Sequence, residues 1–225
     1  YTEPFLCKNL MDFVDYAHKK GIIDILISTN ATVFNQEWAR KILDSGVTQI
    51  FFSIDAATKE TYNRIRRGAN WDKVMDNIDY FLNLKKKLNR KLPLTRVNFC
   101  RQPLNVEEAE QFVLQWQHKV DRIVLQTSYD KEIFKKFDYE IKTERIRKGF
   151  TCAQLWQRLV VRYDGKIYPC ANFYEGAFEP GDLNKTSIKE YWNEKIHKGL
   201  MASHESGKYH TVPACYACAY SYYRG

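Results

Sequence analysis

The sequence has 225 residues, enough for one large domain or for a large domain followed by a small one. Apolar residues make up 44% and aromatic residues 15%, which indicates a packed globular protein and excludes a disordered chain. No run approaches the roughly 20 apolar residues of a membrane span, and the amino-terminal residues lack the pattern of a secretion signal. We therefore expect a cytoplasmic protein without a membrane partner.

The formal net charge of +8 raises the question of a nucleic-acid partner. Much of the excess lies in the segment NLKKKLNRKLP, residues 83–93, which is typical of the solvated end of a long helix. We expect no nucleic-acid partner. A nucleic-acid substrate would be favoured only if the surface formed by residues 85–91 joined the substrate-binding end of the protein.

Helices and strands alternate through the first 127 residues. Apolar residues at spacings of three and four predict helices, and short apolar runs predict buried strands. The predicted helices span residues 9–20, 36–45, 58–66, 71–87 and 106–118. Asn35 and Asn105 directly precede two of these helices, and we expect them to cap those helices. The predicted strands span residues 24–29, 49–55, 95–100 and 122–127.

This alternation of apolar strands with helices predicts a parallel α/β sheet or barrel. In such folds ligands bind at the carboxyl ends of the strands. The polar residues found there are Thr29, Asn30, Ser53, Asp55 and Gln126.

The pattern changes after about residue 130. A charged stretch, residues 129–149, precedes an alternating segment, residues 159–170, in which Asp164-Gly165 predicts a β-hairpin turn. A helix over residues 187–200 follows, with Ser187 and Glu190 as a capping box. We expect two domains, residues 1–131 and residues 132–225.

Four of the six cysteines fall in the second domain: Cys152, Cys170, Cys215 and Cys218. In a reducing compartment thiols more often bind metal than form disulfides, and a small domain gains much from a metal staple. We expect Cys215 and Cys218 to lie in one turn and to face a shared centre. Their spacing leaves both zinc and an iron–sulfur cluster open.

Several motifs of the second domain resemble the auxiliary-cluster region of radical S-adenosylmethionine (SAM) enzymes, the SPASM or twitch type. The motifs are the hairpin DGKIYPC, with Gly165 and Cys170 as Gly-x4-Cys, the segment GDLNKTSIKEYW and the terminal CYAC. The full SPASM pattern has seven cysteines. The second domain of this sequence has four, so it resembles the shorter twitch form. The resemblance implies that Cys152, Cys170, Cys215 and Cys218 hold one auxiliary 4Fe–4S cluster.

The first domain resembles the same family. YTEPFL is similar to the Gly-Gly-Glu-Pro motif, which implies that Glu3 binds the amino group of SAM. ISTNAT and FSIDAATKETYNRIRRG resemble the next two strand ends, which adds Thr29, Asn30, Ser53 and Arg66 to the expected cofactor site. The implied fold is a partial (β/α)6 TIM-like barrel, incomplete at its amino terminus, followed by a small α+β domain with a hairpin.

The family holds its catalytic 4Fe–4S cluster with Cys-x3-Cys-x2-Cys, and this motif does not occur in the sequence. We expect the motif and its cluster in a segment upstream of Tyr1. On this expectation the chain is a fragment that is inactive by itself.

The resemblance implies that the complete protein is an oxidoreductase or maturase that generates a 5′-deoxyadenosyl radical to abstract hydrogen from a carbohydrate or a peptide. Flavodoxin or ferredoxin is the expected electron donor. Two alternatives remain, a metal-stapled binding module without turnover and a nucleic-acid-modifying radical enzyme. Candidates for substrate stacking are Tyr129, Phe173 and Tyr174, whereas we expect His204 and His210 at the surface and Cys100 as a buried structural thiol.

Overall fold

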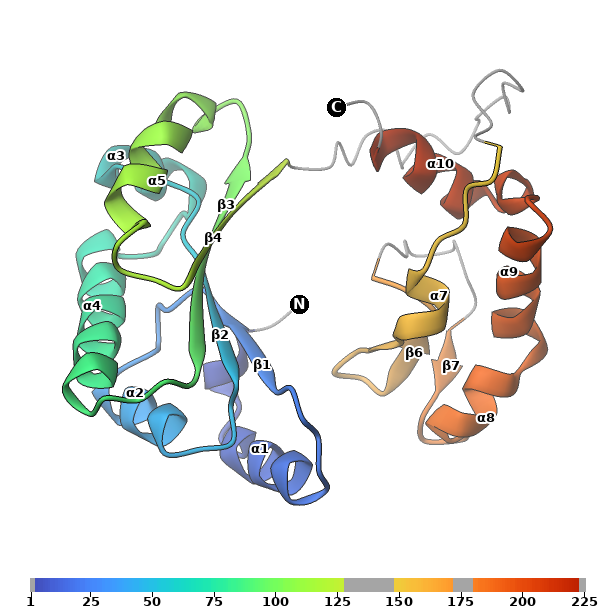
Figure 1. Cartoon of the computed structure of the whole chain (residues 1–225), viewed down its shortest axis with the longest axis horizontal. Coiled ribbons are helices and arrows are strands. Elements are labelled where there is room, and N and C mark those ends of the chain that lie inside the picture. Colours follow the sequence, from blue (N-terminus) through green and yellow to red (C-terminus); the bar gives the residue numbers. More distant parts are fainter. Residues whose placement is uncertain (1–2, 128–147, 172–179, 223–225) are drawn as a thin grey trace. The chain divides into compact units, whose positions relative to one another are not determined.

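The computed structural model describes residues 3–127, 148–171 and 180–222 (Figure 1). The chain forms two compact units, residues 1–128 and residues 129–225. The domain boundary expected between residues 131 and 132 lies outside the described residues.

The first unit is built on a parallel sheet of four strands in the order β1-β2-β3-β4. These strands are β1 Leu26–Thr29, β2 Gln49–Ser53, β3 Leu94–Arg101 and β4 Arg122–Thr127. The register pairs Thr29 with Phe52, and Ser53 with Asn98. Each strand pairs with the next one along the chain, as the alternating pattern predicts, and the expected α/β class is confirmed.

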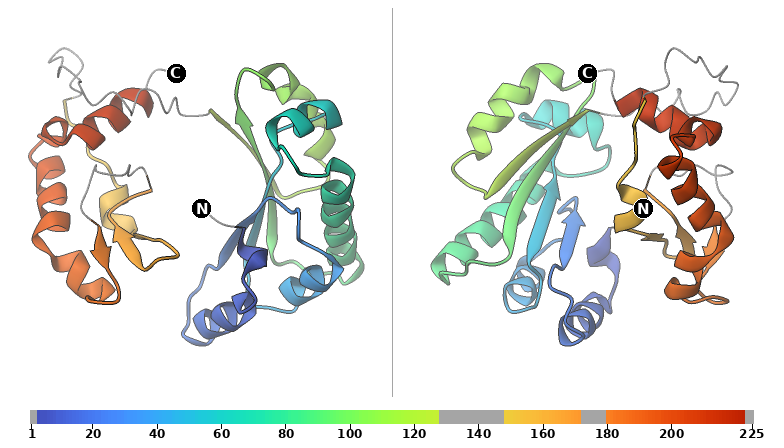
Figure 2. Two further views of the ribbon diagram at one scale, coloured as in Figure 1. Left: turned by 180° about the vertical axis from the view of Figure 1, so that it is seen from behind. Right: turned by 45° about the vertical axis from the view of Figure 1, so that its right-hand side comes forward.

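Helices precede and connect these strands, and the connecting helices cover one face of the sheet (Figures 1 and 2). They are η1 Pro4–Leu6, α1 Leu10–Lys19, α2 Gln36–Leu43, α3 Lys59–Ile65, α4 Trp71–Lys87, η2 Val106–Glu108 and α5 Ala109–Trp116. In the part of the chain that the structure describes, no helix is long and apolar enough to cross a membrane.

The two faces of the sheet differ in chemistry because side chains alternate along each strand. On the face that packs against the helices, Ile50, Phe52, Val97 and Phe99 are fully buried in the core. By this alternation the opposite face carries Leu26, Ser28, Gln49, Phe51, Ser53, Leu94, Arg96, Asn98, Cys100, Arg122, Val124 and Gln126, most of them polar or charged. We call this opposite side the polar face.

Asparagine and threonine side chains begin three of the helices. Asn35, Thr58 and Asn70 each accept a hydrogen bond from the backbone N–H three residues later, so the predicted cap at Asn35 is confirmed. The predicted cap at Asn105 is wrong. Its amide instead donates to the carbonyl oxygens of Asp55, at 2.8 Å, and Cys100, at 2.9 Å.

The second unit contains an antiparallel sheet in the order β5-β6-β7. Its strands are β5 Val160–Val161, β6 Lys166–Tyr168 and β7 Gly181–Asp182. The first two form the hairpin that the sequence predicts, and Gly165 in its turn has a φ of 79°. A positive φ is strained for most residues but not for glycine, which explains the Asp-Gly signal.

Short helices complete the second unit: α7 Gln154–Gln157, α8 Ile188–Asn193, α9 Lys195–Glu205, η4 Tyr209–Thr211 and α10 Pro213–Tyr222. The capping box of Ser187 and Glu190 is confirmed. The single helix predicted over residues 187–200 is wrong, because the extended backbone of Glu194, with ψ 155°, separates α8 from α9. The terminal cysteines lie in α10 rather than in a turn.

Replacing Gly181 with alanine should destabilise the second unit. An added Cβ would lie 2.4 Å from Tyr191 Cδ2 and 2.6 Å from Ile167 Cγ2, and both side chains are fully buried. Such overpacking costs about 1–3 kcal/mol, so the Tm measured by thermal unfolding should fall. The matched control is Gly199→Ala in α9, where no atom lies within 4 Å and the Tm should hold or rise. Equal Tm values for the two variants would contradict this packing.

Replacing Asn105 with alanine should destabilise the first unit. The side chain is 1% exposed and also accepts a hydrogen bond from Gln102 N at 2.8 Å. Its loss leaves buried backbone groups without partners, at a cost of about 1–3 kcal/mol in the free energy of unfolding. Denaturant titration measures this free energy. The control Asn193→Ala removes an exposed side chain that donates a hydrogen bond to Lys189 O, and it should change the free energy of unfolding by less than about 0.5 kcal/mol.

Candidate functional site

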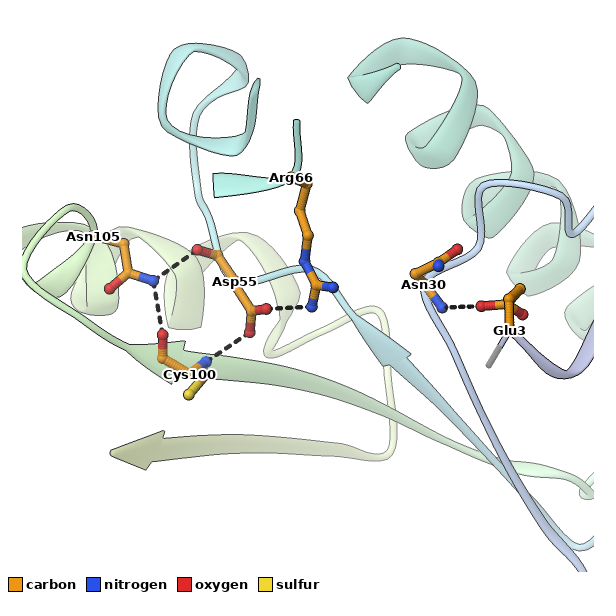
Figure 3. A network of polar contacts seen from close by, with 6 residues as sticks. All are labelled: Glu3, Asn30, Asp55, Arg66, Cys100 and Asn105. Atoms are coloured by element: carbon orange, nitrogen blue, oxygen red, sulfur yellow. Dashed lines mark hydrogen bonds and ion pairs between the residues drawn. The ribbon is translucent and has the colours of Figure 1, made fainter. Parts of the chain in front are cut away.

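The Glu3 carboxylate is fixed at the carboxyl end of β1 (Figure 3). Its Oε1 accepts hydrogen bonds from Thr29 Oγ1 at 2.6 Å and from Phe5 N at 3.4 Å, and its Oε2 accepts one from Asn30 N at 2.9 Å. Within residues 3–127 no lysine or arginine forms an ion pair with it. A carboxylate offers about four acceptor positions, so an oriented negative charge retains room for a cationic donor.

The turn after β1 is itself held by hydrogen bonds. Thr29 Oγ1 also accepts from Ala31 N at 2.9 Å, and Ala31 has a positive φ of 59°. Asn77 of α4 donates to Ala31 O at 2.9 Å, and Asn30 Oδ1 accepts from the backbone and hydroxyl of Thr32. These bonds fix the groups that orient Glu3.

Asp55 joins three elements where β2 ends. Its Oδ1 accepts from Cys100 N at 2.7 Å, and its Oδ2 forms an ion pair with Arg66, directly after α3 (Figure 3). The residue is 6% exposed and has a φ of 62°, a conformation that aspartate tolerates better than most residues. The carboxylate therefore links the ends of β2 and β3 to α3.

The structure brings Glu3, Thr29 and Asn30 of the predicted cofactor site into direct contact. Ser53 ends the neighbouring strand on the polar face, while Arg66 is paired with Asp55. Their role in cofactor binding stays a prediction. The link that Asn105 makes between Asp55 and Cys100 is not predicted by the sequence, where its one signal is an asparagine in the loop after a strand.

The thiol of Cys100 lies beside this network. Burial is the main cause that raises its pKa, and the negative charge of Asp55 raises it further. A raised pKa reduces the fraction of reactive thiolate. Cys100 is half-buried rather than buried, and its structural role stays a prediction.

The four cysteines of the second unit come from three segments, and three of them influence the fourth electrostatically. Cys152 precedes α7, Cys170 follows β6, and Cys215 and Cys218 are three residues apart in α10. Burial is the main cause that raises the pKa of the Cys215 thiol far above its ordinary value, and the thiols of Cys170, Cys218 and Cys152 raise it further. That effect indicates that each of these three thiols lies in the neighbourhood of Cys215.

The donor set fits an iron–sulfur cluster, which four thiolates hold, and a bound metal centre favours the thiolate over the thiol. Across the described ranges, no three His, Cys, Asp or Glu side chains are spaced as ligands of a single metal ion. All six cysteines, each a described residue, are thiols.

His204 contacts the first of these cysteines, Cys152. Its Nδ1 accepts a hydrogen bond from Cys152 N at 3.2 Å, and its side chain is 1% exposed. Burial lowers the pKa of the imidazole, which favours the neutral ring that such a bond needs. The surface position expected for His204 is therefore wrong.

The basic segment lies at the end of the sheet remote from Glu3. Helix α4 ends at Lys87 and the chain enters β3 at Leu94, so residues 85–91 lie at the amino ends of the strands (Figure 1). Lys85 pairs with Asp121 there, and Arg90 pairs with Asp44. A nucleic-acid substrate would be favoured only if residues 85–91 lay at the substrate-binding end, and this position does not meet that condition. The aromatic candidates Tyr129, Phe173 and Tyr174 lie outside the described residues.

Two family sequence models match the chain. The model of the radical SAM superfamily matches residues 1–90, and the model of the SPASM iron–sulfur cluster-binding domain matches residues 152–219. These models imply SAM and 4Fe–4S clusters, an auxiliary cluster included, as cofactors, which confirms the expected cofactor set.

Curated relatives include a GTP 3′,8-cyclase of Thermodesulfovibrio yellowstonii, 29% identical over 154 residues, which are 64% of this chain and 45% of that protein. A probable GTP 3′,8-cyclase of Methanocaldococcus jannaschii is 26% identical over 106 residues, 47% of this chain and 33% of the relative. The chain thus spans less than half the length of these two cyclases. A tungsten-containing aldehyde ferredoxin oxidoreductase cofactor-modifying protein of Pyrococcus furiosus is 23% identical over 96% of this chain and 71% of its own length.

The fold is shared with Streptococcus suis SuiB. The structure of SuiB bound to its precursor peptide SuiA matches with a TM-score of 0.62 and 13% identity, over 89% of this chain and 54% of SuiB. The structure of SuiB bound to SAM matches the same shares of both chains with a TM-score of 0.57 and 12% identity. Residues 1–90 of the chain are therefore similar to the radical SAM superfamily, and residues 152–219 are similar to the SPASM iron–sulfur cluster-binding domain.

Proposed function

We propose that the complete protein is a radical SAM enzyme that oxidises or matures a peptide or carbohydrate substrate by hydrogen abstraction. The observation that supports this best is the Glu3 carboxylate, oriented by Thr29 and Asn30 at the carboxyl edge of the sheet without a cationic partner among residues 3–127. When bound, SAM and the catalytic cluster supply a 5′-deoxyadenosyl radical that abstracts a hydrogen atom.

Glu3 would bind the amino group of SAM. Its carboxylate already accepts three hydrogen bonds, so its position is set before the cofactor arrives. An ammonium group donates strong charge-assisted hydrogen bonds to such an acceptor. Thr29 and Asn30 act through Glu3, and Ser53 offers a hydroxyl at the end of the adjacent strand.

Cys152, Cys170, Cys215 and Cys218 would hold one auxiliary 4Fe–4S cluster, the twitch arrangement. The mutual effect of these thiols on Cys215 supports a single centre. When bound, such a cluster supplies a one-electron acceptor or donor within the second unit. The hydrogen bond from Cys152 N to His204 would fix the backbone of the first ligand.

A peptide is the favoured substrate because the fold matches SuiB, whose structure contains its precursor peptide SuiA. A carbohydrate remains the second candidate. Flavodoxin or ferredoxin is the proposed electron donor, and the cytoplasm, where thiols stay reduced, is the proposed location. The alternative is a zinc-stapled binding module without turnover. Measured iron, sulfide and zinc contents distinguish it from the cluster-containing enzyme.

Anaerobically prepared protein should contain an iron–sulfur cluster at the four cysteines. We expect about four iron and four acid-labile sulfide per chain of residues 1–225, by chemical analysis with zinc measured in parallel. Cys218→Ala should lose most of both because one of four ligands is gone. The control Cys7→Ala removes an exposed cysteine of the first unit and should keep the full content.

One zinc per chain without sulfide would contradict the cluster and would favour a zinc-stapled module. Equal loss of iron in the Cys7 and Cys218 variants would contradict the assignment of ligands. Retention of a folded chain is checked by circular dichroism.

Replacing Glu3 with glutamine should weaken SAM binding. The change preserves the shape of the side chain but removes the charge, and hydrogen bonds to charged groups contribute about 1.5–3 kcal/mol. We expect affinity to fall about tenfold or more in equilibrium dialysis of the cluster-loaded protein with labelled SAM. The control Glu60→Gln in α3 changes the same charge on an exposed side chain and should leave affinity unchanged. Equal affinity of parent and Glu3 variant would exclude this role.

A further inference from the structure

Arg96 extends over the polar face of the sheet. Its guanidinium carbon lies 3.6 Å from the centre of the Phe51 ring, and its Nε donates to Asn98 Oδ1 at 2.7 Å. These two contacts restrict the side chain to one orientation. Phe51, beneath it, is only 9% exposed.

The charge of Arg96 is not balanced within the first unit. None of the four strands contains an aspartate or a glutamate, so the polar face has no acidic side chain of its own. Within residues 3–127, Asp55 at the end of β2 is already paired with Arg66, and no carboxylate pairs with Arg96.

A second arginine adds to this charge. Arg122 is the partner of Arg96 in the register of β3 and β4, so both side chains belong to the polar face. Burial is the main cause that lowers the pKa of Arg96, and the positive charge of Arg122 lowers it further. An anion between the two guanidinium groups would relieve their repulsion.

The hydrogen bond to Asn98 shows the direction in which Arg96 points. Asn98 is two residues closer to the carboxyl end of β3, about 7 Å along the strand. Asn98 is in turn the register partner of Ser53. The guanidinium therefore reaches toward the row of residues at the carboxyl edge.

We propose that Arg96, assisted by Arg122 and oriented by Phe51 and Asn98, binds an oxyanion group of the substrate, a carboxylate or a phosphate. The inference rests on the proposed function, because it places a substrate on the polar face. A guanidinium is a fork of donors that matches both oxyanions, and its stacking on an aromatic ring fixes the fork before binding. Asn98 engages Nε, and the two terminal nitrogens have no hydrogen-bond partner among the described residues.

Isothermal titration of the cluster-loaded protein with paired probes tests this assignment. N-acetylglutamate against N-acetylglutamine measures preference for a carboxylate, and glucose 6-phosphate against glucose measures preference for a phosphate. We expect one charged probe of the four to bind measurably better than its neutral partner. Its affinity should fall about tenfold or more in Arg96→Gln, and less in Arg122→Gln and Arg96→Lys.

The control Arg90→Gln removes the same charge from the loop after α4, where Arg90 pairs with Asp44, and should leave probe affinity unchanged. Equal binding of charged and neutral probes, or equal affinity in the Arg90 and Arg96 variants, would overturn the proposal. Arg96→Lys keeps the charge but lacks the planar fork of donors, so it replaces Arg96→Gln in the titration if that variant does not fold.

Labelled SAM separates this proposal from the function on which it rests. Arg96→Gln should retain the SAM affinity of the parent, since Arg96 is not part of the Glu3 site. If the complete protein, loaded with its clusters, fails to bind SAM, the proposed function fails, while the probe titrations still decide the assignment of Arg96.

Discussion

Parallel pairing of β1, β2 and β3 is the constraint on which the candidate site depends. Backbone hydrogen bonds place Thr29 beside Phe52 and Ser53 beside Asn98, so the polar ends of separate strands meet at one edge. Because a shift of one residue would turn each side chain to the other face, the buried core on the helix side fixes which residues face outward. Fully buried Ile50, Phe52 and Val97 thus set the position of Ser53.

The two units use different means to place their polar groups. In the first unit a large apolar core carries the strands, and carboxylates such as Glu3 and Asp55 connect their ends. The second unit has short strands, and the thiols of Cys152, Cys170 and Cys218 act on that of Cys215. A metal centre adds to the stability of such a domain because it is absent from the unfolded chain.

Local patterns in the sequence predict most of the architecture. Strand β4 and helix α4 have the predicted bounds, because their apolar spacing and caps act over a few residues. The errors arise where distant groups compete. Asn105 bonds to Asp55 and Cys100 rather than to its helix, and His204 is buried against Cys152 instead of lying at the surface. For the candidate cofactor site the motifs select Glu3, Thr29 and Asn30, which the structure brings into contact, but no local signal reveals the pairing of Arg66 with Asp55.

That pairing determines how Arg66 can respond to any other anion. Asp55 is 6% exposed, and removal of its partner would leave a buried negative charge, which typically costs about 3–5 kcal/mol. Arg66 therefore stays with Asp55, yet its buried Nε has no hydrogen-bond partner in the described part of the chain. An anion that reaches this guanidinium would join the pair as a third member rather than displace Asp55, so the strand ends would keep their link while a ligand enters or leaves.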